Sequence, residues 1–116
     1  MIRLIALCTE SRFRILFALC ALAVLVLALL PPSIPEPTTG WDKANHLLAF
    51  GVLAMLGVRA WPGRAWRVSL ALIAYGAAIE VLQSLTTYRD ASALDLVADA
   101  AGIALGMLLS YRAIRA

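Results

Sequence analysis

The stretch ILFALCALAVLVLALL, residues 15–30, decides the class of fold, because none of its 16 residues is polar. A helix on the surface of a soluble domain needs a polar face, and this stretch cannot provide one. The chain of 116 residues is 63% hydrophobic and 15% charged, whereas about a quarter of a soluble domain is charged. We therefore predict an all-α membrane protein that forms one domain over residues 1–116.

Three further apolar runs accompany this stretch, and each run is close to 18 residues long. That length is near the lower limit for a helix that crosses a hydrocarbon core of about 30 Å. The predicted membrane spans are residues 13–30, 44–61, 68–85 and 93–111. The proline-rich segment 31–40 cannot continue a helix, and Pro62-Gly63 indicates a turn. The sequence thus predicts a four-transmembrane-helix bundle, in which the short connection 86–92 makes the last two spans an antiparallel hairpin.

The charged residues are distributed unevenly between the two ends of the predicted spans. Lys43 and Arg89 lie at one end, together with most of the acidic residues. The other eight basic residues lie at the opposite end and are Arg3, Arg12, Arg14, Arg59, Arg64, Arg67, Arg112 and Arg115. Membrane proteins keep an excess of Lys and Arg on the cytoplasmic side, so we expect both termini in the cytoplasm. Because the basic residues are used in this way, the net charge of +3 does not indicate a nucleic-acid partner.

Ionisable and polar residues recur at helical spacing near the outer ends of three spans. They are Asp42 and His46 on the second span, Glu80 and Gln83 on the third, and Asp95 and Asp99 on the fourth. A charged group at the centre of a membrane helix costs about 2.5–3.5 kcal/mol, so such groups usually face a protein interior. Deeper on the same helix faces lie Gly57, Gly76, Gly102 and Gly106, and small residues let membrane helices approach closely. The pattern predicts faces that pack tightly at depth and open into a polar pocket outside.

The residue types in this pocket suggest acid–base chemistry on an anionic group. His46 is the candidate general acid or base, with Glu80 or Asp99 to orient its ring. The candidate substrate-binding residues are Asp42, Lys43, Gln83, Arg89 and Asp95. Of these, Arg89 and Lys43 would hold an anionic group such as a lipid phosphate.

A metal ion is a less favoured interpretation of the same residues. One histidine and several carboxylates suit Zn²⁺ or Mn²⁺. His46 is the only histidine of the chain, however, and zinc sites usually contain more than one. The predicted site therefore includes no metal ligands, and the sequence leaves any cofactor unknown.

Helix capping is a structural explanation for some of these residues. Thr39 with Asp42, and Ser92 with Asp95, fit the [ST]-x-x-[DE] pattern of a capping box. Both aspartates would then satisfy unpaired amides at the starts of helices. Lys43 is expected to face water or lipid headgroups.

Capping is not expected to explain the residues that lie about one turn inside their spans, which are His46, Glu80 and Asp99. For these three residues the structural alternative is a buried hydrogen-bond network that holds the helices together. The sequence alone leaves both the functional and the structural interpretation open.

Taken together, these motifs resemble those of the VanZ-like family of small bacterial membrane proteins. The resemblance is carried by Asp42-Lys43-x-x-His46-x-x-x-Phe50, Glu80-x-x-Gln83, Arg89 and Asp95-x-x-x-Asp99-x-x-Gly102-x-x-x-Gly106. It extends over residues 13–110, with one departure, because the family commonly has asparagine where this chain has Asp99. The resemblance implies a multi-pass protein of the bacterial cytoplasmic membrane. It also implies a connection with resistance to teicoplanin, a lipoglycopeptide that acts on the cell wall.

Three functions are consistent with this pattern. The first is an envelope protein whose outward-facing pocket binds or modifies a lipid-linked cell-wall precursor or a lipoglycopeptide, with membrane lipids as further partners. The second is a small proton- or ion-coupled transporter, which with four short spans would have to assemble into a homo-oligomer. The sequence offers no charged residues deep in the cytoplasmic half to continue such a relay. The third is a non-catalytic scaffold that binds another envelope protein.

Overall fold

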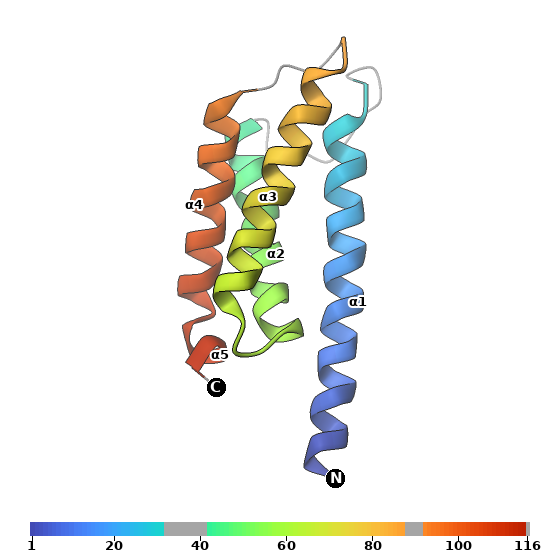
Figure 1. Ribbon diagram of the computed structural model, residues 1–116, viewed down its shortest axis with the longest axis vertical. Coiled ribbons are helices and arrows are strands. Elements are labelled where there is room, and N and C mark those ends of the chain that lie inside the picture. The colour runs from blue at the N-terminus through green and yellow to red at the C-terminus, as the bar shows by residue number, and fades with distance from the viewer. Residues whose placement is uncertain (32–41, 88–91, 116) are drawn as a thin grey trace.

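The computed structural model describes residues 1–31, 42–87 and 92–115, apart from the side chains of Ala6 and Asp42. All regular secondary structure within these residues is helical. The helices are α1 (Ile2–Leu29), α2 (Asp42–Ala60), α3 (Ala65–Ser84), α4 (Ala93–Leu109) and α5 (Tyr111–Arg115). They form an elongated bundle of 52 × 23 × 23 Å (Figure 1). The prediction of an all-α fold is confirmed.

The first helix is longer than the sequence pattern predicted. The predicted membrane span begins at about residue 13, whereas the helix that contains it, α1, begins at Ile2 and has 28 residues. No proline or glycine interrupts residues 2–12, so the helix continues past the apolar stretch. At 1.5 Å per residue it is about 42 Å long, which exceeds a hydrocarbon core of about 30 Å. Its N-terminal turns accordingly project beyond the other helices (Figure 1).

The other predicted spans agree with α2, α3 and α4 to within three residues at each end. Among the described helices, α1 and α3 are long and apolar enough to cross a membrane. α4 has only 17 residues and is therefore about 26 Å long. α2 carries Lys43, His46 and Arg59 within its 19 residues. By length and composition, α1 and α3 are thus the two candidate membrane-crossing helices among those described.

Helix α2 is the centre of the bundle and contacts each of the other helices. Its most extensive contact is with α4, and glycines make that contact close. A Cβ atom added at Gly102 would collide with the carbonyl oxygen of Leu47, and one at Gly106 would collide with the backbone of Gly51. Because small residues let helix backbones approach, the predicted close packing through these two glycines is confirmed.

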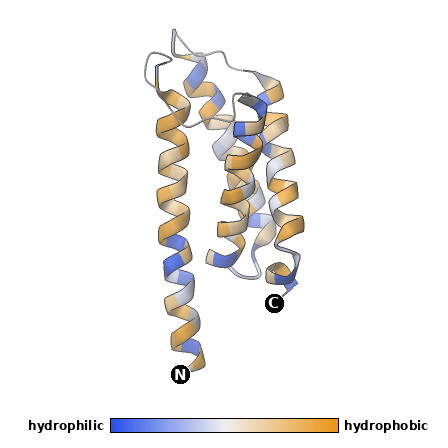
Figure 2. Ribbon diagram, turned by 180° about the vertical axis from the view of Figure 1, so that it is seen from behind, coloured by the Kyte–Doolittle hydropathy of each residue, from blue (hydrophilic) through white to orange (hydrophobic). Residues whose placement is uncertain are grey.

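Helix α1 packs against the bundle with one face and leaves the other exposed. The packed face is tied to α3 by two hydrogen bonds, from the Tyr75 hydroxyl to the Ala21 carbonyl and from Gln83 Nε2 to the Ala28 carbonyl (2.9 Å). The exposed face includes Ile15, Leu19 and Leu22, which are 60%, 59% and 58% exposed. Hydrophobic residues cover most of the length of α1, with polar residues in its N-terminal half (Figure 2). The exposed face is suited to contact with lipid or a second copy.

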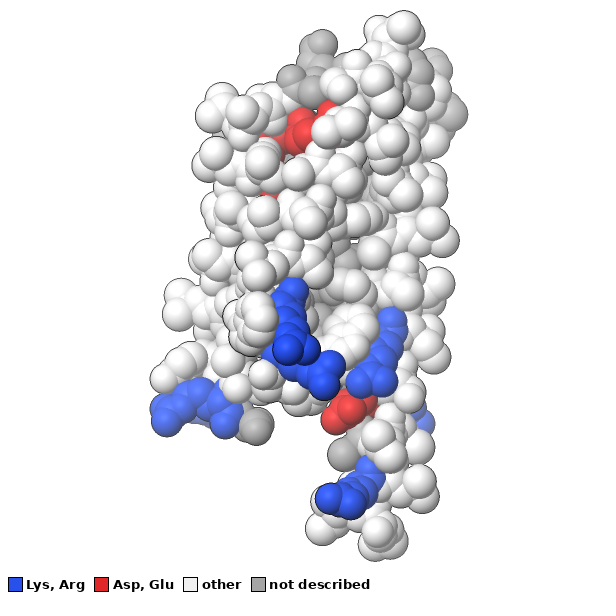
Figure 3. Space-filling model, viewed as in Figure 1, with Lys and Arg blue, Asp and Glu red and all other residues white. Residues whose placement is uncertain are grey.

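Both chain termini lie at the same end of the bundle (Figure 1). Basic side chains gather toward that end, where an acidic group lies among them, and further acidic side chains appear near the opposite end (Figure 3). The turn between α2 and α3 lies at the basic end. Within it Gly63 has a φ of 76°, a left-handed conformation that favours glycine. The predicted Pro62-Gly63 turn is confirmed.

Candidate functional site

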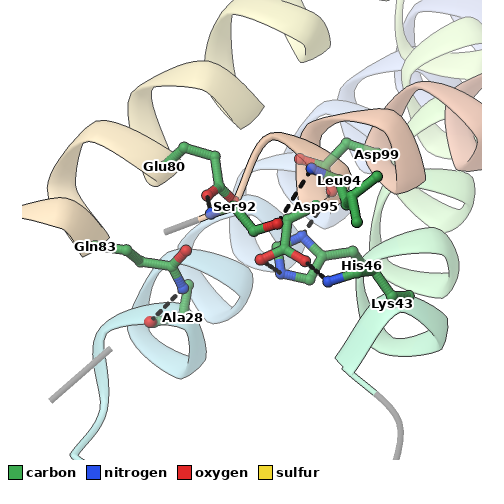
Figure 4. A network of polar contacts seen from close by, with 9 residues as sticks. All are labelled: Ala28, Lys43, His46, Glu80, Gln83, Ser92, Leu94, Asp95 and Asp99. Carbon is green, nitrogen blue, oxygen red and sulfur yellow. Dashed lines mark hydrogen bonds and ion pairs between the residues drawn. The ribbon is translucent and has the colours of Figure 1, made fainter. Parts of the chain in front are cut away.

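Three helices bring ionisable side chains together at the end of the bundle opposite the termini. His46 lies one turn inside α2, Glu80 lies one turn before the end of α3, and Asp95 and Asp99 occupy the first two turns of α4. Because α3 runs antiparallel to α2 and α4, its C-terminal end meets their N-terminal ends (Figure 1). The four side chains point toward one another, as Figure 4 shows.

The imidazole of His46 lies between two carboxylates of α4. Its Nδ1 is 2.7 Å from Asp99 Oδ1, and its Nε2 is 3.7 Å from Asp95 Oδ2. The His46 side chain is 12% exposed, and that of Asp99 is fully buried. A carboxylate that accepts a hydrogen bond from one ring nitrogen fixes the orientation of the ring and the role of the other nitrogen. Of the two orienting residues considered from the sequence, it is Asp99 that contacts the ring.

Lys43 is part of this cluster. Its Nζ lies 2.6 Å from Asp95 Oδ1, and only 3% of the Asp95 side chain is exposed. The expectation that Lys43 faces water or headgroups holds only in part, since its side chain is 31% exposed but its ammonium contacts a buried carboxylate. Lys43 and His46 are three residues apart on α2, so both side chains face α4. A buried carboxylate needs a positive partner, and Lys43 supplies it.

Glu80 caps the start of α4 from a neighbouring helix. The Ser92 backbone N–H donates to Glu80 Oε2 at 2.9 Å, and Ser92 Oγ accepts from the Leu94 N–H at 3.2 Å. Ser92 thus caps the helix as predicted, but the predicted role of Asp95 in the capping box is wrong. The Asp95 carboxylate contacts Lys43 and His46, and Glu80 accepts the bond from the Ser92 N–H in its place. The expectation that capping does not involve Glu80 is also wrong. The signal that could have revealed this contact is the short connection 86–92, which returns the chain from α3 to the start of α4.

Among the residues that the structure describes, two buried carboxylate oxygens of the cluster have no hydrogen-bond partner, Glu80 Oε1 and Asp99 Oδ2. Asp99 Oδ2 faces α3 at Gly76, where an added Cβ atom would lie 2.7 Å from it. Gly76 therefore leaves room for the carboxylate, a function beyond close helix packing. His46, Glu80 and Asp99 each offer one ligand atom, and these three atoms lie within 4.8 Å of one another. Among the described residues, these three side chains form a group that could hold a metal ion.

The remaining candidate residues lie apart from His46 or outside the described structure. Gln83 is 5% exposed, and its amide donates to the Ala28 carbonyl of α1, turned away from His46 (Figure 4). Arg89 and Thr39 lie outside the described residues, as does the side chain of Asp42. The roles predicted for these three residues stay predictions.

The Glu80–Ser92 contact predicts different effects for two substitutions of Glu80. In buffer that contains a metal chelator, Glu80→Gln keeps an oxygen acceptor for the Ser92 N–H and should change the free energy of unfolding little. Glu80→Leu removes that acceptor and should lower the free energy of unfolding by about 1–2 kcal/mol, as other losses of a helix cap do. Unfolding in mixed detergent, followed by circular dichroism, measures both changes. Equal stability of the two variants would contradict the capping role.

An apolar helical bundle with a buried histidine–carboxylate cluster at one end is typical of a small membrane protein with a polar site. The chain belongs to the VanZ/LLP1 family, whose model matches residues 5–115. This match confirms the resemblance recognised from the sequence motifs. No curated protein and no solved structure matches the chain.

Proposed function

We propose that this chain is a four-span protein of the bacterial cytoplasmic membrane that binds or modifies a lipid-linked component of the cell envelope. Family membership and the apolar helices α1 and α3 support a membrane location. The gathering of arginines at the end that carries both termini supports a cytoplasmic position for that end. In this topology α2 and α4 also cross the membrane, and the polar cluster lies near the outer surface.

The observation that carries the proposal is the position of His46 between Asp99 and Asp95. Its side chain is 12% exposed and lies at the end of the bundle opposite the arginines. With the termini in the cytoplasm, that end faces the outer leaflet, where the headgroups of envelope precursors lie. Ionisable groups held at membrane depth usually mark a substrate or ion site.

The geometry suggests how the cluster would act on a headgroup. When Nδ1 of His46 donates to Asp99 Oδ1, Nε2 becomes the ring nitrogen that exchanges protons. Histidine exchanges protons near neutral pH, which suits a general acid or base. The ammonium of Lys43, held against Asp95, supplies positive charge near an anionic headgroup.

A pocket at the basic end supports membrane lipids as additional partners. Its volume is about 240 Å³, and it is lined by Phe17, Trp61, Arg64, Arg67, Val68 and Ala71. Four of these six lining residues are apolar, and the other two are arginines. An acyl chain with an anionic headgroup fits this combination, as basic pockets between membrane helices often bind anionic lipids.

The lipids that stay with the purified protein test the proposal. Wild-type protein purified from bacterial membranes in mild detergent should be enriched in phosphate-linked envelope precursors, measured by mass spectrometry against the bulk membrane. His46→Ala should lower this enrichment about tenfold, because a hydrogen bond to a charged group contributes about 1.5–3 kcal/mol. Leu70→Ala is the matched control, since Leu70 is 61% exposed on α3. Wild-type protein without enrichment, or His46→Ala with unchanged enrichment, would overturn the proposal.

The same variants separate the proposal from the other two functions. Expression of the wild-type protein in a susceptible host should raise the inhibitory concentration of teicoplanin, and His46→Ala should not. Full tolerance of His46→Gln combined with Glu80→Gln would favour a non-catalytic scaffold. Dissipation of a pH gradient by purified protein in liposomes would favour a transporter.

A further inference from the structure

We propose that His46, Glu80 and Asp99 bind a divalent transition-metal ion of the Zn²⁺ or Mn²⁺ class. This inference rests on the proposed function, because the ion would supply the positive charge that the binding of an anionic headgroup needs at this site. The three side chains come from three different helices, α2, α3 and α4. Each offers one ligand atom, and the three atoms lie within 4.8 Å of one another.

The charges of the described side chains in the cluster favour the binding of a cation. The described ionisable side chains of the cluster are three carboxylates, those of Glu80, Asp95 and Asp99, one ammonium group, that of Lys43, and the imidazole of His46, which contacts Asp99. Lys43 contacts Asp95, at 2.6 Å, rather than either of the other two carboxylates. Burying carboxylates without a positive partner costs several kcal/mol each, and an anionic headgroup would add further repulsion. A divalent ion between Glu80 and Asp99 would neutralise both carboxylates at once.

The unpartnered oxygens are a second and independent observation. Asp99 is 0% exposed, yet its Oδ2 accepts no hydrogen bond, and Glu80 Oε1 is buried without a partner as well. Buried polar atoms nearly always have a partner, so two such oxygens in one cluster indicate a missing cation or proton. Asp99 Oδ2 faces α3 at Gly76, and Glu80 lies one turn further along the same face of α3. Both carboxylates therefore lie along the same face of α3.

The distances allow coordination after small side-chain movements. Bonds of 2.0–2.2 Å to a metal ion place the ligand atoms of a tetrahedral site about 3.4 Å apart. The three ligand atoms lie within 4.8 Å of one another, so coordination would require the side chains to move closer together. Glu80 keeps its bond to the Ser92 N–H through Oε2 while it offers Oε1. The structural and metal-binding roles of Glu80 are therefore compatible.

The donor set selects the class of ion. One imidazole nitrogen with two carboxylates suits Zn²⁺ or Mn²⁺, whereas Mg²⁺ and Ca²⁺ prefer sites built from oxygen alone. Three protein ligands also leave at least one coordination position for a further group. A phosphate oxygen of the headgroup would fill that position. With the ion bound, His46 would act as a ligand in place of a general acid or base, so the site would bind the headgroup through the ion.

Elemental analysis of the purified full-length protein tests the inference. After dialysis against ZnCl₂ or MnCl₂ and removal of excess ion, the wild-type protein should retain about one ion per chain, and chelation should lower its melting temperature. His46→Gln and Glu80→Gln should each lower the retained metal at least tenfold. Glu80→Gln is the cleaner variant, because its amide oxygen still accepts the bond from Ser92. Glu10→Gln, at the basic end, removes a carboxylate elsewhere and should leave the metal content unchanged.

Lipid analysis of the same samples distinguishes the failure of this inference from the failure of the proposed function. Metal content of the wild type no higher than that of both variants, with no shift of the melting temperature, would overturn the metal site. If those samples still contain enriched precursor lipids, the proposed function stands without the metal. Retained metal without lipid enrichment would overturn the proposed function and leave the metal site standing.

Discussion

Replacing Gly102 with valine is expected to prevent α2 and α4 from packing and to abolish the folded protein. A Cβ atom at this position would already collide with the carbonyl oxygen of Leu47 and would lie 3.0 Å from its Cα. Both obstacles belong to the backbone of α2, so no side chain can rotate to make room. Overpacking a well-packed interface costs about 1–3 kcal/mol for a small group, and we expect this from Gly102→Ala. The larger valine must separate the two helices that form the most extensive contact of the bundle.

The measurement is the free energy of unfolding in mixed detergent, together with the yield of monodisperse protein. Ala104→Val is the matched control, because Ala104 lies on the same helix and is exposed. It should behave like the wild type. Wild-type stability of Gly102→Val would show that α2 and α4 do not pack through this glycine. The contacts of the polar cluster between α2 and α4, which depend on that packing, would then be contradicted as well.

Removing the ammonium group of Lys43 is expected to produce the second large effect. Lys43→Met leaves the Asp95 carboxylate, with its side chain only 3% exposed, without its contact at 2.6 Å. Breaking a buried ion pair from one side costs about 3–5 kcal/mol, and the nearby His46 should reduce this toward about 3 kcal/mol. The double variant Lys43→Met with Asp95→Leu should regain most of this loss, because apolar residues can replace both members of a buried pair with little change in stability.

A double-mutant cycle measured by unfolding gives the coupling between the two side chains directly. Additive effects of Lys43→Met and Asp95→Leu would mean that the two residues do not interact. Asp95→Leu alone should lower the stability less than Lys43→Met, because the longer lysine side chain is 31% exposed and can turn its charge toward water.

The sequence by itself determined the helices and the end of the molecule at which the polar residues gather. Apolar runs and helix breakers are local features, so the bounds of α2, α3 and α4 could be predicted to within three residues. Helical spacing placed His46, Glu80 and Asp99 on faces that converge, and glycines such as Gly102 indicated where helices approach closely. The family could also be recognised from these motifs, as the match over residues 5–115 confirms. Residues 2–12 show no continuous apolar pattern, so the sequence did not reveal that α1 begins at Ile2, although no residue among them ends a helix.

Only the tertiary structure decided which side chain contacts which. The spacing of residues fixes the face of a helix, but it fixes neither its rotation nor its depth against a neighbour. The close packing at Gly102 and Gly106 sets the rotation and the depth of α4 against α2. This arrangement places Asp99 against His46 and Asp95 against Lys43. Because the chain turns back after α3, the Ser92 N–H reaches the Glu80 carboxylate and donates a hydrogen bond to it. Because α1 packs beside α3, the Gln83 amide donates to the Ala28 carbonyl. Contacts between helices depend on distances of a few ångströms, which no local pattern encodes.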